Sequence, residues 1–294
     1  MPELPEVEHA ATCLRAWLVG RTLDRVRAPA SRVLRGASPI TLARKLRGRR
    51  LRAVDRRSKY LLLRFDGDVG LLAHLGMTGK WVLRARGETP PPHTRLTLET
   101  GARAVHYVDP RMFGRLALHA AGELDALPEI RVIGPDPHRE KVGGALLAAR
   151  LGKTRRAIKV ALLDPRVIAG IGNILATEAL WRARIHPARP ATSLGSAELA
   201  ALARAVRASI RLQMGTLEAA SDATYLSEDA SHNPFLAYGR VGEPCSRCAT
   251  PFLTMVLGGR GSAFCPTCQV APRTSRTARA TRGRASVRGP GSLP

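Results

Sequence analysis

The first residues of the chain carry two groups that can do chemistry together. The stretch MPELPEVE places Pro2 directly behind the initiator methionine and Glu3 directly behind Pro2. If the initiator is removed, Pro2 becomes a free secondary amine. An α-amino group has an ordinary pKa of about 7.7–8.0, so it needs little perturbation to become a nucleophile at neutral pH. Its attack on an aldehyde carbon would give a cationic iminium that promotes elimination, with Glu3 moving protons at the same centre.

The same residues also allow a purely structural interpretation, in which PELPEVE only begins a helix. Glu6 and Glu8 would then favour the positive N-terminal end of that helix. From Pro5 the apolar residues keep a helical period, and Gly20 is a plausible end of the helix. Small tautomerases also use an N-terminal proline, but they lack zinc and a large basic body.

Four of the five cysteines form two CxxC pairs, CSRC and CPTC. Each pair can place two thiolates on one tight turn, and two such turns at the base of a β hairpin complete a tetrahedral site. The pattern predicts one structural Zn2+ with no open coordination position. This use of cysteine is typical of a reducing compartment rather than of a secreted disulfide framework. The predicted ligands are Cys245, Cys248, Cys265 and Cys268.

Basic residues dominate the charge of the chain. The 294 residues include 47 Lys or Arg and 23 Asp or Glu, which gives a formal net charge of +24. Residues 271–294 contain six arginines and no acid, and without them the net charge would still be +18. This charge indicates a polyanionic partner, nucleic acid first. No run of about 18 apolar residues occurs, so we expect no membrane span, and the acidic start does not resemble a signal peptide.

The chain changes character near GPDPHRE (134–140). Before this stretch, short and partly alternating segments separated by Gly, Asp or Pro predict an antiparallel β sandwich or barrel over roughly 20–120. The predicted strands are KYLLLRF, GLLAHLGM, KWVLRA, RLTLET and RAVHYV.

Beyond residue 140 the sequence is rich in Ala, Leu and Arg and predicts helices. The clearest helix begins near Ser196, which can cap it, and can end at Gly215. Before it, PRVIAGIGNILATEALWRARIHP predicts two helical pieces broken by AGIGN. Residues 216–240 predict a long loop, and the segment from 271 onward predicts disorder because it has almost nothing to bury.

Several motifs occur together: PELPEVE, RRSKYLLL (56–63), HLGMTG (74–79), DPRMFG (109–114), GIGNILATEAL (170–180), YGRVGEPC (238–245) and the four cysteines. In this combination the chain resembles the formamidopyrimidine-DNA glycosylase family of bifunctional base-excision enzymes, over about residues 1–268. The related endonuclease VIII branch usually has glycine where this chain has Leu4.

The resemblance implies an α+β fold with DNA bound in a cleft between two domains. An N-terminal antiparallel β sandwich with flanking helices would precede a helical helix–two-turns–helix module and a C-terminal zinc ribbon. The expected division is a catalytic domain at 1–133, a DNA-binding domain at 134–237, the ribbon at 238–269 and a basic disordered tail at 270–294.

The resemblance also implies catalytic roles. Pro2 would attack the anomeric carbon of the sugar as the damaged base leaves, and Glu3 would act as the acid that assists sugar opening and base loss. Glu6 would help to order the catalytic terminus. Lys59 would donate a proton and bind phosphate during β-elimination. Arg260, at the tip of the ribbon hairpin, would stabilise the leaving group of a second elimination as a phosphate clamp, since guanidinium is effectively never deprotonated.

Other positions resemble the residues that hold the DNA. An apolar side chain and an aromatic wedge can replace the stacking that is lost when a nucleotide is everted, and a planar arginine can face the orphaned base. Backbone amides of GIGN at a helix start can cradle phosphate. The gap-filling residues would be Met77, Arg111 and Phe113, and the backbone contacts His74, His93, Arg155 and Asn173.

Two features depart from the family pattern. Met112 stands where an arginine usually follows Arg111, so one phosphate contact would be lost. The segment SDATYLSEDASHNPFLAYGR does not closely resemble the usual lesion-capping loop, which bears on the preference for 8-oxoguanine. It offers alternative lid groups, Tyr225, His232, Asn233 and Phe235.

We therefore expect a monomeric cytoplasmic enzyme of the bacterial nucleoid. It would remove oxidised purines, formamidopyrimidines and 8-oxoguanine, from damaged double-stranded DNA and nick the abasic site by β,δ-elimination. Zinc would be its only cofactor. Two alternatives are the same chemistry on oxidised pyrimidines and a DNA-binding homologue that has lost activity, against which the intact Pro2, Glu3 and Lys59 argue.

Overall fold

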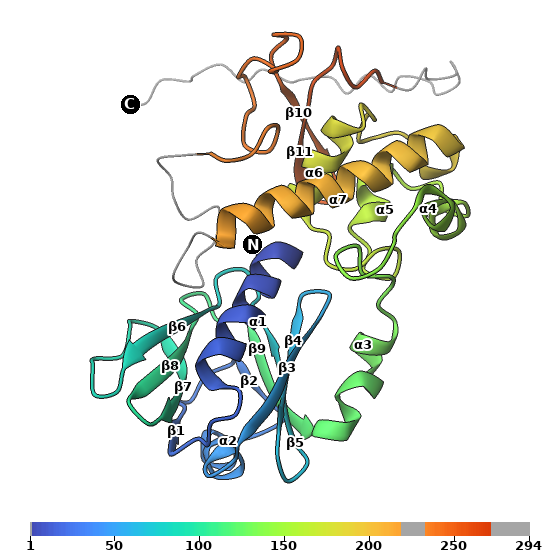
Figure 1. Cartoon of the computed structure of the whole chain (residues 1–294). Helices are drawn as coiled ribbons and strands as arrows, with labels where there is room; N and C mark the ends of the chain where they lie inside the picture. The colour runs from blue at the N-terminus through green and yellow to red at the C-terminus, as the bar shows by residue number, and fades with distance from the viewer. Residues whose placement is uncertain (1, 219–232, 272–294) are drawn as a thin grey trace, which may run out of the picture.

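The computed structural model describes residues 2–218 and 233–271. The N-terminal part forms two β sheets with helix α1 against them, and the following helices form a second body on which a small hairpin lies (Figure 1). This arrangement confirms the expected α+β fold. The predicted lid groups Tyr225 and His232, and the basic tail from residue 272, lie outside the described residues.

The N-terminal core lies between two sheets. One sheet has the strand order β1-β7-β8-β6 and the other β2-β9-β5-β4-β3. Residues of α1 (Leu4–Leu18) contribute to this core together with residues of both sheets. All five predicted strand segments are strands. The strands are β1 Arg25–Arg27, β2 Leu34–Arg35, β3 Leu51–Arg57, β4 Tyr60–Phe65, β5 Val69–His74, β6 Lys80–Ala85, β7 Thr94–Thr100, β8 Arg103–Val108 and β9 Arg115–Ala120.

Two details of this domain differ from the prediction. The pairing of β2 with β9 is parallel, so the sandwich is not wholly antiparallel. A short helix, α2 (Pro39–Leu46), lies inside the region predicted to be strands. Ser38 caps it by accepting the N–H of Thr41. Only two of its residues are buried, Leu42 and Leu46, so its apolar period is too short to recognise in the sequence.

The helical body has its own core. Residues from four helices form it, and Leu4, the first residue of α1, packs there rather than in the sandwich. The start of α1 is thereby fixed between the two bodies. The elements are α4 Gly144–Leu151, α5 Ile158–Leu162, α6 Asn173–Arg182 and α7 Ser196–Glu218, preceded by η1 Ala121–Ala126 and α3 Pro128–Arg131, with η2 Ala191–Ser193 between α6 and α7.

Three expectations for this region are wrong. The residues before AGIGN form turns rather than a first helical piece, and only α6 after it is a helix. Ser196 is the first helical residue, and the carboxylate of Glu198 accepts the N–H of Gly195 at the helix start instead. Helix α7 continues past Gly215 to Glu218. Buried Leu217 prolongs its apolar face, while Gly215 faces open space and imposes no turn.

The C-terminal hairpin consists of β10 (Leu253–Leu257) and β11 (Arg260–Phe264), which pair antiparallel. The segment leading into it is anchored by the buried Glu178 of α6, whose carboxylate accepts the backbone N–H groups of Leu236, Ala237 and Tyr238 at 2.8–3.1 Å. In the described parts of the chain no helix is long and apolar enough to cross a membrane.

Candidate active site

The carboxylate of Glu3 occupies the N-terminus of helix α6. It accepts the backbone N–H groups of Gly172 at 3.0 Å, Ile174 at 2.8 Å and Leu175 at 2.9 Å, and Glu3 is 1% exposed. The positive end of a helix favours such an anion. The GIGN amides were expected to cradle a phosphate. In the structure three amides of this turn bind Glu3 instead, which fixes the residue next to Pro2.

Glu6 completes the anchoring of the N-terminal segment. Its Oε2 accepts the N–H of Glu3 at 2.9 Å, and the Glu3 side chain in turn accepts the N–H of Glu6, which makes a capping box at the start of α1. The N–H of Leu4 donates to the carbonyl of Gly170 at 3.1 Å. Burial, and secondly the Glu3 carboxylate, raise the pKa of Glu6 to about 7. The chain is thus held on the C-terminal side of Pro2, which is itself buried.

Lys59 lies on the tight turn between β3 and β4 and faces the same site. Burial lowers the pKa of Lys59, while the Glu3 and Glu6 carboxylates oppose the shift and Arg260 adds to it. The preceding Ser58 adopts φ +56°, and its hydroxyl accepts the N–H of Gly170 at 2.9 Å. The charges of Glu3, Glu6, Lys59 and Arg260, four of the predicted catalytic groups, are therefore close enough to influence one another.

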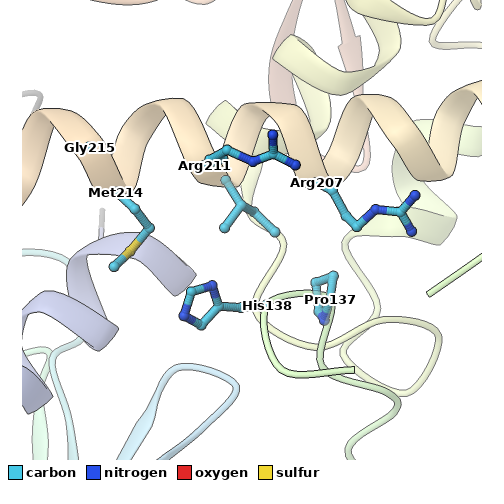
Figure 2. Close-up of a pocket in the computed structure, with 7 residues that line it drawn as sticks. Pro137, His138, Arg207, Arg211, Met214 and Gly215 are labelled. Carbon is cyan, nitrogen blue, oxygen red and sulfur yellow. The ribbon is translucent and has the colours of Figure 1, made fainter. Parts of the chain in front are cut away.

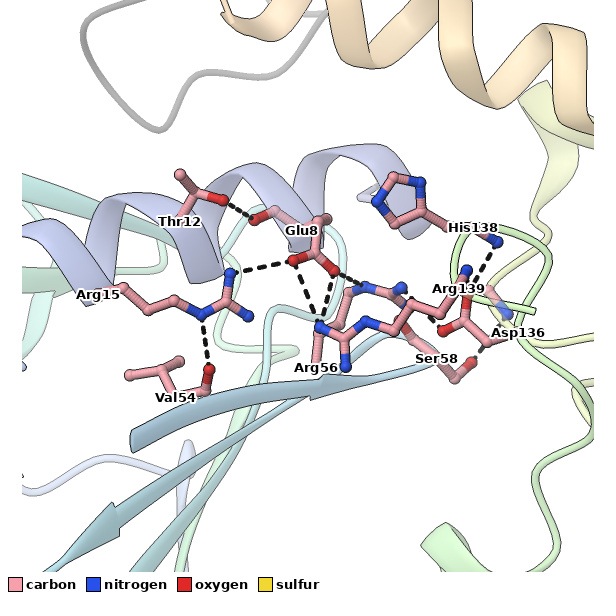
Figure 3. A network of polar contacts seen from close by, with 10 residues as sticks. Glu8, Thr12, Arg15, Val54, Arg56, Ser58, Asp136, His138 and Arg139 are labelled. Carbon is pink, nitrogen blue, oxygen red and sulfur yellow. Dashed lines mark hydrogen bonds and ion pairs between the residues drawn. The ribbon is translucent and has the colours of Figure 1, made fainter. Parts of the chain in front are cut away.

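A buried ion network supports this turn (Figure 3). Arg56 has a fully buried side chain that forms ion pairs with Glu8 of α1 and with Asp136, at 2.8 Å, of the 134–140 segment. Its Nη1 also donates to the carbonyl of Ser58 at 3.0 Å. One side chain thus joins α1, β3 and the segment between the two bodies. Sequence analysis missed Arg56, because an arginine in an arginine-rich chain carries no pattern of its own.

The backbone carbonyl of Gly261 attaches the hairpin tip with Arg260 to the helical body. The oxygen of Gly261 accepts Nδ2 of Asn173 at 3.2 Å and Nζ of Lys159 at 3.1 Å. Lys159 is fully buried and also donates to Thr177 at 3.0 Å, and burial lowers its pKa to about 8. Sequence analysis missed Lys159, although it is one of only six lysines in the chain.

Met77 and Phe113 form an exposed apolar pair of loop tips, with 39% and 48% of their surfaces exposed. The guanidinium carbon of Arg111 lies 4.7 Å from the centre of the Phe113 ring. Arg32, which sequence analysis missed, donates to the carbonyl of Arg111 at 2.9 Å. Met112 adopts φ +53° and packs against the N-terminal core, so this departure from the family pattern places an apolar side chain against the sandwich.

The predicted backbone contacts occupy different settings. His74 is partly buried at the end of β5, and its Nδ1 accepts the N–H of Gly76 at 3.0 Å. Burial, then Lys59 and Arg115, lower the pKa of His74 to about 4, so its imidazole is neutral at pH 7. His93 and Arg155 are exposed.

The four cysteines meet as predicted. One Sγ from each of Cys245, Cys248, Cys265 and Cys268 lies within 4.8 Å of all the others. Sγ of Cys248 lies 3.4 Å from that of Cys265 and 3.6 Å from that of Cys268. A tetrahedral zinc with Zn–S of about 2.3 Å requires sulfur atoms about 3.8 Å apart. The set therefore fits one Zn2+ without an open position, and the ion would hold together the base of the β10–β11 hairpin.

A separate cavity of about 360 Å³ lies between α7 and the 134–140 segment (Figure 2). None of the site residues predicted from the sequence lines it. Its walls are basic and apolar, and the lining residues are Pro137, His138, Arg207, Ile210, Arg211, Met214 and Gly215.

Comparison with protein families agrees with this site. The family model of the formamidopyrimidine-DNA glycosylase N-terminal domain matches residues 1–116, its H2TH domain matches 133–221, and a zinc finger found in FPG and IleRS matches 242–270. The formamidopyrimidine-DNA glycosylase of Thermus thermophilus is 41% identical over 277 residues, which cover 92% of this chain and 98% of that protein.

Solved structures agree as well. The Lactococcus lactis Fpg bound to DNA with an abasic site superposes with a TM-score of 0.81 at 29% identity, covering 92% of this chain and all of the other. The same Lactococcus protein has been solved with N7-benzyl-Fapy-dG and with an oxidised pyrimidine in DNA. A MutM protein bound to DNA containing carbocyclic 8-oxo-G matches with a TM-score of 0.81 at 31% identity. This chain belongs to the formamidopyrimidine-DNA glycosylase family.

Proposed function

We propose that the protein excises oxidised purines from duplex DNA and then nicks the abasic site by β,δ-elimination. The observation that carries this proposal is the binding of the Glu3 carboxylate by the first turn of α6. It fixes the residue after Pro2 at the junction of the two bodies, within electrostatic reach of Lys59. A helix start would need only one acidic group, whereas this site gathers two carboxylates and a buried lysine next to Pro2, whose amine would be free after loss of the initiator.

The proposed reaction begins at Pro2. After loss of the initiator, its nitrogen attacks the anomeric carbon and the bond to the damaged base breaks, with Glu3 assisting the opening of the sugar. The resulting iminium withdraws electrons, so a proton leaves the neighbouring carbon and the 3′ phosphate departs. Lys59 contacts this phosphate. In a second elimination a proton leaves C4′ as the C5′–O bond breaks, and the departing 5′ phosphate is stabilised by Arg260 as a clamp.

The remaining predicted residues would bind the duplex. Met77 and Phe113 fill the space of the everted nucleotide, and Arg111 faces the orphaned base. The backbone contacts would be His74, His93, Arg155 and Asn173. Zn2+ is structural in this proposal and keeps the Arg260 hairpin folded. We also propose that the protein acts as a monomer and that its functional units are residues 1–133, 134–237 and 238–269.

Oxidised purines are favoured as substrates because the similar proteins solved with lesion DNA include complexes with a Fapy-dG derivative and with 8-oxo-G. Oxidised pyrimidines remain the second candidate, since the Lactococcus protein has also been solved with one. We expect formamidopyrimidines to be cut at least as well as 8-oxoguanine, and single-turnover kinetics on a panel of lesion duplexes would rank all three.

Borohydride trapping tests the chemistry directly. Incubation with a duplex containing 8-oxoguanine opposite cytosine should give a covalent protein–DNA adduct on Pro2. Protein that retains Met1 should form no adduct and show no lyase activity. An adduct on a lysine, or none from active protein, would refute the role of Pro2.

A further inference from the structure

Asp109, directly after β8, is a buried carboxylate shared by two loops. It is fully buried, and its Oδ1 accepts the hydroxyl of Thr78 at 2.7 Å and the N–H of Met112 at 3.1 Å. Its Oδ2 accepts the N–H of Gly114 at 2.8 Å. Thr78 belongs to the loop of Met77, whereas Met112 and Gly114 flank Phe113. One carboxylate therefore bonds to both loops whose tips form the exposed apolar pair.

The backbone of Asp109 extends these connections to a third segment. Its N–H donates to the carbonyl of His93 at 3.1 Å, and its carbonyl accepts Nε of Arg95 at 3.1 Å. Asp109 is thus bonded to the loop of His93 as well, which is one of the proposed phosphate contacts.

The two loops also pack without space between their backbones. A β carbon on Gly76, which has φ +63°, would collide with the backbone of Phe113 and Gly114. A β carbon on Gly79 or on Gly114 would collide with the hydroxyl of Tyr107. Close backbone packing and one shared carboxylate therefore hold the two loops against each other.

We propose that Asp109 is a positioning residue that couples the Met77 loop to the Arg111–Phe113 loop, so that both enter the vacated space as one wedge. This inference rests on the proposed function, in which those loops fill the gap left by an everted nucleotide. All three donors to the carboxylate are neutral, so its task is to accept hydrogen bonds from both loops. An asparagine has the same shape but only one acceptor oxygen. In either orientation its amide nitrogen faces a backbone N–H of the Arg111–Phe113 loop, that of Gly114 or that of Met112, so the link to this loop is weakened.

The test compares Asp109→Asn with the wild-type protein. A fluorescent base analogue beside the lesion reports eversion, and single-turnover assays report excision of 8-oxoguanine paired with cytosine and nicking of a preformed abasic site in single-stranded DNA. Asp109→Asn should slow eversion and excision at least about tenfold and leave nicking of single-stranded abasic DNA within about twofold. Glu99→Gln is the matched control, because Glu99 is a buried carboxylate of the same sheet that pairs with Arg27 and Arg86. It should change none of the three rates.

A milder variant keeps the test valid if Asp109→Asn does not fold. Thr78→Val removes one donor, so the energetic coupling between Met77→Ala and Phe113→Ala in a double-mutant cycle on eversion should shrink. Unchanged coupling, or normal eversion in Asp109→Asn, would overturn the proposal while leaving the proposed chemistry intact. If Met77→Ala and Phe113→Ala themselves leave eversion unchanged, these residues do not fill the space of the everted nucleotide. That result would refute both this part of the proposed function and the coupling role of Asp109.

Discussion

The carboxylate of Glu6 accepts the backbone N–H of Glu3 at 2.9 Å, and Glu3 itself is bonded to the first turn of α6. Two buried carboxyl groups therefore lie side by side at the amine end of the chain. Burial and the neighbouring Glu3 raise the pKa of Glu6 from its ordinary value of 4.5 to about 7. The protonation of Glu6 is thereby linked to the folding of the catalytic terminus.

This linkage predicts how stability depends on pH. A carboxyl group whose pKa is higher in the folded than in the unfolded state stabilises the fold when it is protonated. For Glu6 this stabilisation is complete below about pH 4.5 and is lost as the pH rises through about 7. Glu6→Gln stays neutral, so wild type should lose on the order of 3 kcal/mol relative to Glu6→Gln over that range. Thermal midpoints at pH 4.5, 6 and 8 measure it. Glu243→Gln, at an exposed carboxyl paired with Arg240, should show no such trend, and a pH-independent difference for Glu6→Gln would contradict the linkage.

The buried Arg56 network predicts a large loss from one substitution. Arg56→Met leaves the carboxylates of Glu8 and Asp136 without their buried partner, which typically costs about 3–5 kcal/mol. It also removes the hydrogen bond to the carbonyl of Ser58, which supports the turn carrying Lys59. The β-elimination step, in which Lys59 contacts the phosphate, should therefore slow. Melting temperature and nicking of abasic DNA measure the two effects. The adjacent Arg57→Met is the control: its ion pair with Glu140, at 3.7 Å, is partly exposed, so it should cost less than about 1 kcal/mol. Equal losses from both variants would refute the network's role.

The outcome at these sites shows what a sequence can predict. The start of α1, the five strands and the clustering of the four cysteines follow local patterns, namely a 3.6-residue period, alternation and CxxC spacing, and all are confirmed. The partners of Glu3 lie about 170 positions further along the chain, and no local pattern encodes such a contact. The same holds for Asp109 and Lys159, whose surroundings exist only after folding. The prediction that α7 ends at Gly215 is wrong, because a glycine on an exposed helix face can remain helical. Here buried Leu217 prolongs the helix to Glu218.

The neutral state of His74 predicts a particular salt dependence. Each phosphate neutralised by a cationic side chain contributes a slope of roughly −0.9 in log K against log salt, whereas a neutral imidazole releases no counterion. His74→Ala should therefore weaken DNA binding at pH 7.5 and leave the slope unchanged. Arg260→Ala should reduce the slope by roughly 0.9. DNA-binding titrations at four salt concentrations measure the slope for each variant. Equal slope changes in the two variants would mean that His74 binds DNA as a cation.

Removal of Zn2+ should abolish DNA binding while the N-terminal sandwich stays folded. The ribbon buries few apolar residues besides its cysteines, so its fold depends on Zn2+. Cys265→Ser should lower the zinc content and nearly abolish DNA binding, because the tip with Arg260 loses its support. The sandwich should stay folded, since its core lies elsewhere. Metal analysis, DNA titration and melting curves test this. Full binding by zinc-free protein would show that the thiolates have no structural role.

The last prediction concerns Met112, where the family pattern has an arginine. Met112 packs against the N-terminal core at φ +53°, so Met112→Arg must give up that packing before its guanidinium reaches a phosphate. Stability should fall by about 1–2 kcal/mol, while a new charge-assisted contact should tighten binding to damaged and undamaged duplex alike. The salt slope should steepen by roughly 0.9. Met112→Leu is the control, which keeps an apolar group and should change neither slope nor affinity. Tighter binding to lesion DNA alone would mean that position 112 reads the damage rather than the backbone.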